Sequence, residues 1–194
     1  MNVNKLAEIH GYINTIHPIT NTEFKAFIGI FKFVVLNKNE FFSKEGLRET
    51  RLGIIVSGMI RGYLLDKNDN DVNKMLFSKM DTVGGYSSLI TKQPNQLNYQ
   101  ALTKCTLLIA NYNELLKLYD AYPNIERLAR ISLELKFVAK EKREIELLLL
   151  NATERYLIFK KEHPGIEQKV ALFHIASYIG VTPTQLSRIR KTLI

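Results

Sequence analysis

The spacing of apolar residues changes once along this chain, at about Pro123. Before this residue the chain consists of short β-prone runs separated by turn residues, and after it apolar residues recur every three or four positions. Many short strands predict an antiparallel sandwich or barrel, whereas the later period predicts helices. We therefore expect an α+β fold with a β-rich N-terminal part and a helical C-terminal part.

A series of β-prone runs is expected to form the strands of the N-terminal part. They are Phe31–Leu36, Glu40–Ser43, Arg51–Ser57, Met59–Leu65, Val72–Ser78, Leu97–Leu102 and Thr106–Ala110. The segment Asp66–Asp71 joins two of these runs and is rich in turn-forming residues, which predicts a hairpin loop. A short helical opening and an amphipathic segment near Thr22–Ile30 precede the runs.

The helical part begins with the spacing of a coiled coil. Alternating steps of four and three residues connect Asn124, Leu128, Ile131, Leu135, Val138, Lys142, Ile145 and Leu149. A helix of this length, at about 1.5 Å per residue, extends some 40 Å, more than a small β domain covers. We therefore expect a homodimer through Leu128, Ile131, Leu135, Val138 and Ile145. The alternative is one long helix that packs only on its own domain.

Composition limits the classes of partner and site. The 27 Lys and Arg residues against 19 Asp and Glu leave a net charge of +8, which favours an acidic macromolecule as partner. The single cysteine, Cys105, excludes a disulfide framework and a cluster of thiolate ligands, so we expect a cytoplasmic protein. The histidines lack ligand spacing, and Ser87, Ser88 and His174 lack the spacing of a triad. We expect no metal, no cofactor, no membrane segment and no enzyme.

The segment Leu172–Lys191 has the pattern of a helix-turn-helix. Ala176 is small where a second helix crosses the first, and Gly180 stands where the chain needs a left-handed residue to turn. Thr182 is a good N-cap, and Pro183 suits the first position of the second helix. Upstream, Asn151 and Glu154 have the spacing of a capping box. Two helices joined by a glycine turn also occur in proteins that do not bind DNA.

The second helix of this motif combines hydrogen-bonding and basic side chains. Lys169, Arg188, Arg190 and Lys191 are the charged residues beyond Glu167, so this end of the chain carries no acid. Arg and Gln bind base edges, while Lys, Thr and Ser bind phosphates. The expected DNA-binding residues are Thr182, Thr184, Gln185, Ser187, Arg188, Arg190 and Lys191.

Two segments, Ile175–Arg190 and Thr153–Leu157, resemble the Crp/Fnr family of bacterial transcription regulators, in which a jelly-roll domain related to cyclic-nucleotide-binding domains controls a winged helix-turn-helix. The resemblance implies an N-terminal jelly roll, or double-stranded β-helix, at 1–120, a dimerisation helix at 121–150 and a DNA-binding domain at 151–194. It places Thr184 and Arg188 where family members read bases. Its implied partners are DNA and a second copy, with RNA polymerase as a further candidate. Because the chain ends at Ile194, we expect most or all of the wing to be absent.

The effector pocket departs from the family pattern. When Gly84 is aligned with the glycine of the family's phosphate-binding cassette, its glutamate position is Gly85 and its arginine and serine positions are Asn95 and Gln96. A charge-assisted hydrogen bond contributes about 1.5–3 kcal/mol, so we expect no control by cyclic AMP. The residues left to hold another anion are Gly84, Gly85, Tyr86, Ser87, Ser88, Asn95 and Gln96. A purely structural jelly roll is the alternative.

The function expected from these features is sequence-specific DNA binding by a homodimeric transcription regulator. The alternative is a small-molecule sensor whose output is a protein–protein contact, with the helix pair acting as a docking surface.

Overall fold

The computed structural model describes residues 3–193. Two helices open the chain, α1 (Val3–Ile16) and α2 (Asn21–Gly29), and eight short strands follow within residues 32–111. The strands are β1 (Lys32–Leu36), β2 (Phe41–Ser43), β3 (Arg51–Ser57), β4 (Ile60–Leu65), β5 (Asp71–Phe77), β6 (Thr82–Val83), β7 (Asn98–Ala101) and β8 (Cys105–Asn111). The helix α3 (Tyr86–Thr91) lies between β6 and β7. The expected α+β fold is confirmed.

The strands form two antiparallel four-stranded sheets, in the orders β1-β8-β3-β6 and β2-β7-β4-β5. Side chains alternate between the two faces, as they do in β8, where Leu107 joins the core between the sheets and Leu108 packs under the helices. The predicted hairpin loop is confirmed, because Leu65 of β4 pairs with Asp71 of β5. Within the loop, a carboxylate oxygen of Asp66 accepts hydrogen bonds from the backbone N–H groups of Asn68 and Asn70.

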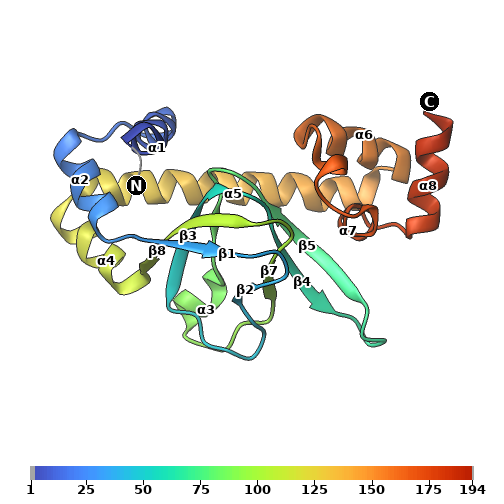
Figure 1. Cartoon of the computed structure of the whole chain (residues 1–194), viewed down its shortest axis with the longest axis horizontal. Coiled ribbons are helices and arrows are strands. Elements are labelled where there is room, and N and C mark those ends of the chain that lie inside the picture. Colours follow the sequence, from blue (N-terminus) through green and yellow to red (C-terminus); the bar gives the residue numbers. More distant parts are fainter. Residues whose placement is uncertain (1–2, 194) are drawn as a thin grey trace.

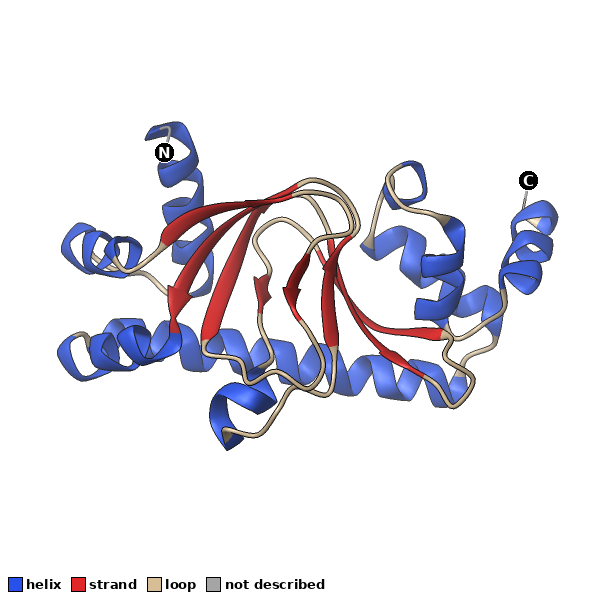
Figure 2. Cartoon of the chain, turned by 60° about the horizontal axis from the view of Figure 1, so that its bottom comes forward, coloured by secondary structure: helices blue, strands red, loops and turns tan. Residues whose placement is uncertain are grey.

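The helical part consists of α4 (Tyr112–Ala121), α5 (Pro123–Leu149), α6 (Ala152–Glu162), the short 3-10 helix η1 (Ile166–Gln168), α7 (Leu172–Ile179) and α8 (Pro183–Thr192). Figure 1 shows α5 passing behind the sheets, with α1, α2 and α4 at its start and α6, α7 and α8 at its end. Figure 2 shows the sheets between these two groups of helices. The long helix therefore connects the two ends of the molecule.

Four elements were not expected from the sequence: β6, α3, α4 and the short η1. The strand β6 has two residues, and α3 has six, which is too short for a hydrophobic period to emerge. The helix α4 follows β8 directly, where the Asn111 side chain accepts a hydrogen bond from the Asn113 N–H and caps the new helix. Among residues 3–193, no helix has both the length and the apolar character that crossing a bilayer requires.

Candidate functional site

The helices α7 and α8 are joined by a tight turn at Gly180, whose φ is 73°. This left-handed conformation suits glycine, as the sequence predicted. Ala176 and Ile179 of α7 are fully buried, and Leu186 of α8 is 1% exposed against them. The small and apolar positions of the motif therefore hold the two helices together.

The start of α8 is stabilised by a capping box. The Thr182 hydroxyl accepts a hydrogen bond from the Gln185 N–H at 3.2 Å, and Gln185 Oε1 accepts one from the Thr182 N–H at 3.0 Å. Pro183 occupies the first turn. The predicted N-cap and helix start are confirmed, and the side-chain oxygens of Thr182 and Gln185 are engaged in the cap.

The outer face of α8 is open to solvent. Its exposed residues include Thr184, Gln185, Ser187, Arg188 and Lys191, together with the cap residue Thr182. Arg190 differs because it is half-buried and its Nε lies 3.2 Å from Oε1 of Glu167 in η1. The Tyr156 hydroxyl donates to the same oxygen at 2.5 Å. Arg190 therefore lies beside a carboxylate, although the sequence pattern suggested a face without acids.

A second candidate site is a cavity of about 280 Å³ beside the sheet β2-β7-β4-β5. It is lined by Glu45, Leu64, Leu65, Lys74, Gly85, Ser87, Asn95, Gln96, Leu97 and Tyr99. Four of the residues expected at an effector pocket are among them: Gly85, Ser87, Asn95 and Gln96. The other lining residues, on β4, β5 and β7 or in the loops beside them, were not predicted from the sequence. Strand residues that line a cavity have no local pattern that marks them.

Asn95 fills the space beside Gly85. A Cβ atom added to Gly85 would lie 1.8 Å from Asn95 Oδ1, so this backbone and this amide are in direct contact. Asn95 is 6% exposed, and its Nδ2 donates a hydrogen bond of 2.7 Å to Ser43 Oγ. Its backbone N–H also donates to the Leu47 carbonyl. Asn95, which we expected at the arginine position of the cassette, is therefore a fixed, neutral side chain.

Three expected pocket residues face other surroundings and do not line the cavity. Tyr86 packs with Tyr112 in the cluster under the helices. Ser88 is 2% exposed and its hydroxyl accepts from the Glu49 N–H, because α3 turns this side chain inward. Gly84 lies against the backbone of β3. A Cβ atom added to Gly84 would lie 3.1 Å from the carbonyl oxygen of Arg51.

The cavity offers mainly neutral groups. Burial and the charge of Glu49 raise the pKa of Tyr99 to about 12, so its phenol remains a neutral hydrogen-bonding group at pH 7. Glu45 and Lys74 contribute opposite charges at the exposed rim. The cavity could therefore offer a phosphate the Lys74 ammonium at its rim, but among the described residues it has no arginine guanidinium to bind the phosphate through two hydrogen bonds.

A third surface is the exposed side of α5. Leu128 lies inside the chain's own core, at 5% exposure, and Ile131 is half-buried. Leu135, Val138 and Ile145 are exposed by 56%, 60% and 51%. Two further apolar side chains, Phe137 and Leu148, are exposed by 65% and 83% beside the seam positions Val138 and Leu149. The exposed apolar stripe therefore begins after Ile131 and is wider than the heptad pattern predicted.

Together these elements define a two-part architecture, a β jelly roll joined by a long helix to a small helical unit. Residues 33–122 match the family model of the cyclic nucleotide-binding domain. That match covers the strands and the cavity and ends just before α5.

Solved structures with the same fold include bacterial regulators. The c-di-GMP-responsive global regulator CLP of Xanthomonas campestris matches with a TM-score of 0.72 and 16% identity, over 90% of this chain and 91% of CLP. FixK2 of Bradyrhizobium japonicum matches with a TM-score of 0.74 and 17% identity, over 84% of each chain. The catabolite activator protein of Thermus thermophilus matches with a TM-score of 0.58 and 16% identity, over 92% and 85%. No curated protein matches the chain in sequence.

Proposed function

We propose that this protein is a homodimeric, sequence-specific DNA-binding transcription regulator of the Crp/Fnr type. The observation that carries the proposal is the exposed face of α8, which presents Thr184, Ser187, Arg188 and Lys191 next to a buried helix-helix contact. A helix of this kind reads base edges in the major groove while its flanking residues bind phosphates. The fold shared with CLP and the catabolite activator protein supports this function.

We further propose that α5 forms the homodimer. Its stripe of Leu135, Val138 and Ile145 is exposed over several turns, and contiguous exposed apolar surface marks interaction sites. A second α5 is the simplest partner for a self-complementary stripe. Two copies of α8 would then bind half-sites about one helical turn of DNA apart.

Cyclic AMP is not the expected effector of this regulator. The neutral amide of Asn95 replaces the cation that a cyclic phosphate requires, and its contact with Gly85 leaves no room there for a glutamate side chain. The cavity is better suited to a neutral or weakly charged molecule. Titration calorimetry with cyclic AMP should detect no binding at micromolar ligand, and micromolar affinity would contradict this part of the proposal.

Selection of binding sites from random duplexes, followed by fluorescence anisotropy, tests the DNA-binding function. The wild-type protein should enrich a two-fold symmetric sequence. Arg188→Ala should cost about 1–3 kcal/mol and relax the preference at one base pair in each half-site. The matched control is Arg127→Ala, an exposed arginine on α5. Equal affinity for selected and random DNA at moderate salt would refute the proposal.

A further inference from the structure

Arg61 of β4 is a buried arginine at the junction between the sheet and the helical unit. It is 5% exposed, and its Nη1 lies 2.6 Å from Asp71 Oδ2. Its Nε and Nη2 donate to Gln100 Oε1 at 3.0 and 2.7 Å. The guanidinium also lies 3.8 Å from the centre of the Tyr63 ring. Strands β4, β5 and β7 therefore all contact this cation.

The same group reaches α7. Arg61 Nη1 lies 3.2 Å from His174 Nδ1. Asn73 of β5, which also contacts Arg61 Nη1 at 3.3 Å, donates from Nδ2 to the His174 carbonyl at 3.0 Å. The Asn73 N–H donates to Ser177 Oγ at 2.8 Å, and that hydroxyl donates to the Asp71 carbonyl at 3.1 Å. Residues about a hundred positions apart are thus joined by a continuous hydrogen-bond network.

His174 must be neutral in this arrangement. Arginine only donates hydrogen bonds, so His174 Nδ1 is the acceptor and its proton lies on Nε2. Burial and the Arg61 charge lower the pKa of His174 to about 4, in agreement with this tautomer. The network is therefore complete at pH 7.

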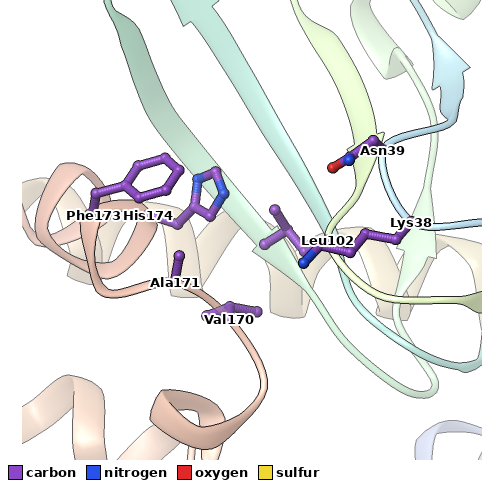
Figure 3. Close-up of a pocket in the computed structure, with 7 residues that line it drawn as sticks. All are labelled: Lys38, Asn39, Leu102, Val170, Ala171, Phe173 and His174. Carbon is purple, nitrogen blue, oxygen red and sulfur yellow. The ribbon is translucent and has the colours of Figure 1, made fainter.

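Beside the network, the sheet and α7 are separated by a cleft of about 260 Å³. Figure 3 shows Lys38 and Asn39 on the sheet side facing Phe173 and His174 on α7, with Leu102, Val170 and Ala171 as the remaining lining residues. Met59 and Leu102 supply apolar contact at this junction. Apolar contact is non-directional, whereas the planar fork of an arginine fixes the groups that it bridges.

We propose that Arg61 is a positioning residue for DNA binding. It fixes the orientation of α7 on the sheet, and thereby the direction in which α8 is presented. A dimer that binds two half-sites needs its two recognition helices at a set separation and angle. The inference about DNA rests on the proposed function, whereas the attachment of α7 to the sheet through Arg61 can be tested without DNA.

Hydrogen exchange of the full chain tests the attachment. In Arg61→Met, the amides of α7 should exchange about tenfold faster than in the wild type, while those of β3 and β8 keep their protection. Lys74→Met is the matched control, because Lys74 is the neighbour of Asn73 on β5 but lines the cavity on the other face of the sheet. It should leave the exchange of α7 unchanged.

The DNA readout compares a selected two-half-site duplex with the same duplex in which one half is scrambled. Arg61→Met should lower the ratio of the two affinities by about tenfold, because a loosely held unit loses the advantage of simultaneous contact. Binding to the single half-site should stay near the wild-type value. A general loss of folding would lower both affinities together. His174→Asn, whose Oδ1 replaces the Nδ1 acceptor, should retain the wild-type ratio.

Unchanged exchange in α7 together with an unchanged affinity ratio in Arg61→Met would overturn the proposal. If Arg61→Met loses protection throughout the sheet, Arg61→Lys decides in its place, because lysine keeps the charge beside Asp71 but lacks the fork that bridges Gln100 and His174. Faster exchange confined to α7 in this variant supports the role of Arg61, and unchanged exchange refutes it. If the wild type prefers no DNA sequence, the proposed function fails while the exchange result still stands.

Discussion

Asn95 shows how one side chain changes what a pocket can bind. Its amide contacts Gly85 so closely that a single added carbon would overlap it, and its hydrogen bond to Ser43 holds it in place. Gly85 and Asn95 are two of the three positions at which we expected a departure from the cassette, and they are sterically coupled: the missing side chain at residue 85 makes room for the amide at residue 95. Both residues can be read from the sequence, but only the structure shows that they are in steric contact.

This coupling predicts a non-additive mutant cycle. Gly85→Ala should destabilise the fold by about 1–3 kcal/mol, because the new methyl group must displace the Asn95 amide. Asn95→Ala should cost about 1 kcal/mol through the lost hydrogen bond to Ser43. The double variant should be more stable than the sum of the single effects by at least about 0.5 kcal/mol.

Urea unfolding of the four proteins measures these changes. Gly11→Ala serves as a control, since an added Cβ there meets nothing within 4 Å and alanine favours helix interiors. It should be neutral or stabilising. Strict additivity between Gly85→Ala and Asn95→Ala would contradict the steric coupling.

His174 makes stability depend on pH. Its pKa is about 4 in the folded protein, lowered first by burial and then by Arg61, against 6.5 ordinarily. Between these values the unfolded chain binds more protons than the folded one, so this group makes the free energy of unfolding rise with pH. Stability attributable to His174 is therefore present above pH 6.5 and is lost as the pH falls towards 4.

His174→Asn removes this titration while keeping an acceptor for Arg61. The slope of unfolding free energy against pH should be smaller in the variant than in the wild type between pH 4 and 6.5. Because carboxylates such as Glu23 titrate in both proteins, their contribution cancels in the difference. Urea titrations at intervals of half a pH unit would measure it, and parallel curves for the two proteins would contradict the assignment.

At the scale of single elements, α5 has two different halves. Its first turns belong to the N-terminal core, where Ile125 and Leu128 are 1% and 5% exposed. Its later turns attach to α7, because the Arg143 guanidinium lies 3.9 Å from the centre of the Tyr178 ring and bonds to the Tyr178 carbonyl. Between and beyond these contacts, the opposite side of the helix is apolar and exposed. The heptad pattern located this helix correctly. It could not distinguish the heptad positions that pack on the core of the same chain from those that remain exposed to solvent.

The exposed stripe predicts that Val138→Asp shifts the protein from dimer to monomer. A carboxylate in an apolar helix-helix contact is costly to bury, so the dimer dissociation constant should rise about tenfold or more. Lys140→Asp is the control, since Lys140 is exposed and lies about 200° around the helix from Val138. Light scattering after size-exclusion chromatography measures both masses. A dimer that persists in Val138→Asp, or a monomeric wild type, would exclude α5 as the dimer contact.

For the whole molecule, sequence patterns predicted what depends on local chemistry. The hairpin loop, the capping box at Asn151, the N-cap at Thr182 and the glycine turn at Gly180 follow from side chains within four residues of each other. The pairing of Arg190 with Glu167, the cavity lining and the Arg61 network depend on residues brought together by folding. No local sequence pattern indicates such contacts. The helix-turn-helix motif could therefore be predicted from the sequence, whereas its attachment to the sheet could not.

In the proposed complex with DNA, the shape of the molecule decides which charges act on the phosphates. The helix α5 has 27 residues and extends about 40 Å, with α2 packed near its start and α7 near its end. A Debye length of about 10 Å at 0.1 M salt confines attraction to cations near the phosphates. Lys191 on α8 should therefore contribute to binding, whereas the exposed Lys25 on α2, at the other end in Figure 1, should not.

Lys191→Ala should weaken binding to all sequences to a similar degree and reduce the slope of log affinity against log salt by about 1. Lys25→Ala should change neither quantity, although both variants lower the net charge equally. Anisotropy titrations between about 50 and 200 mM salt would measure the slopes. Equal effects of the two substitutions would mean that the net charge of +8 acts as a whole, and that its position on α8 is not what attracts DNA.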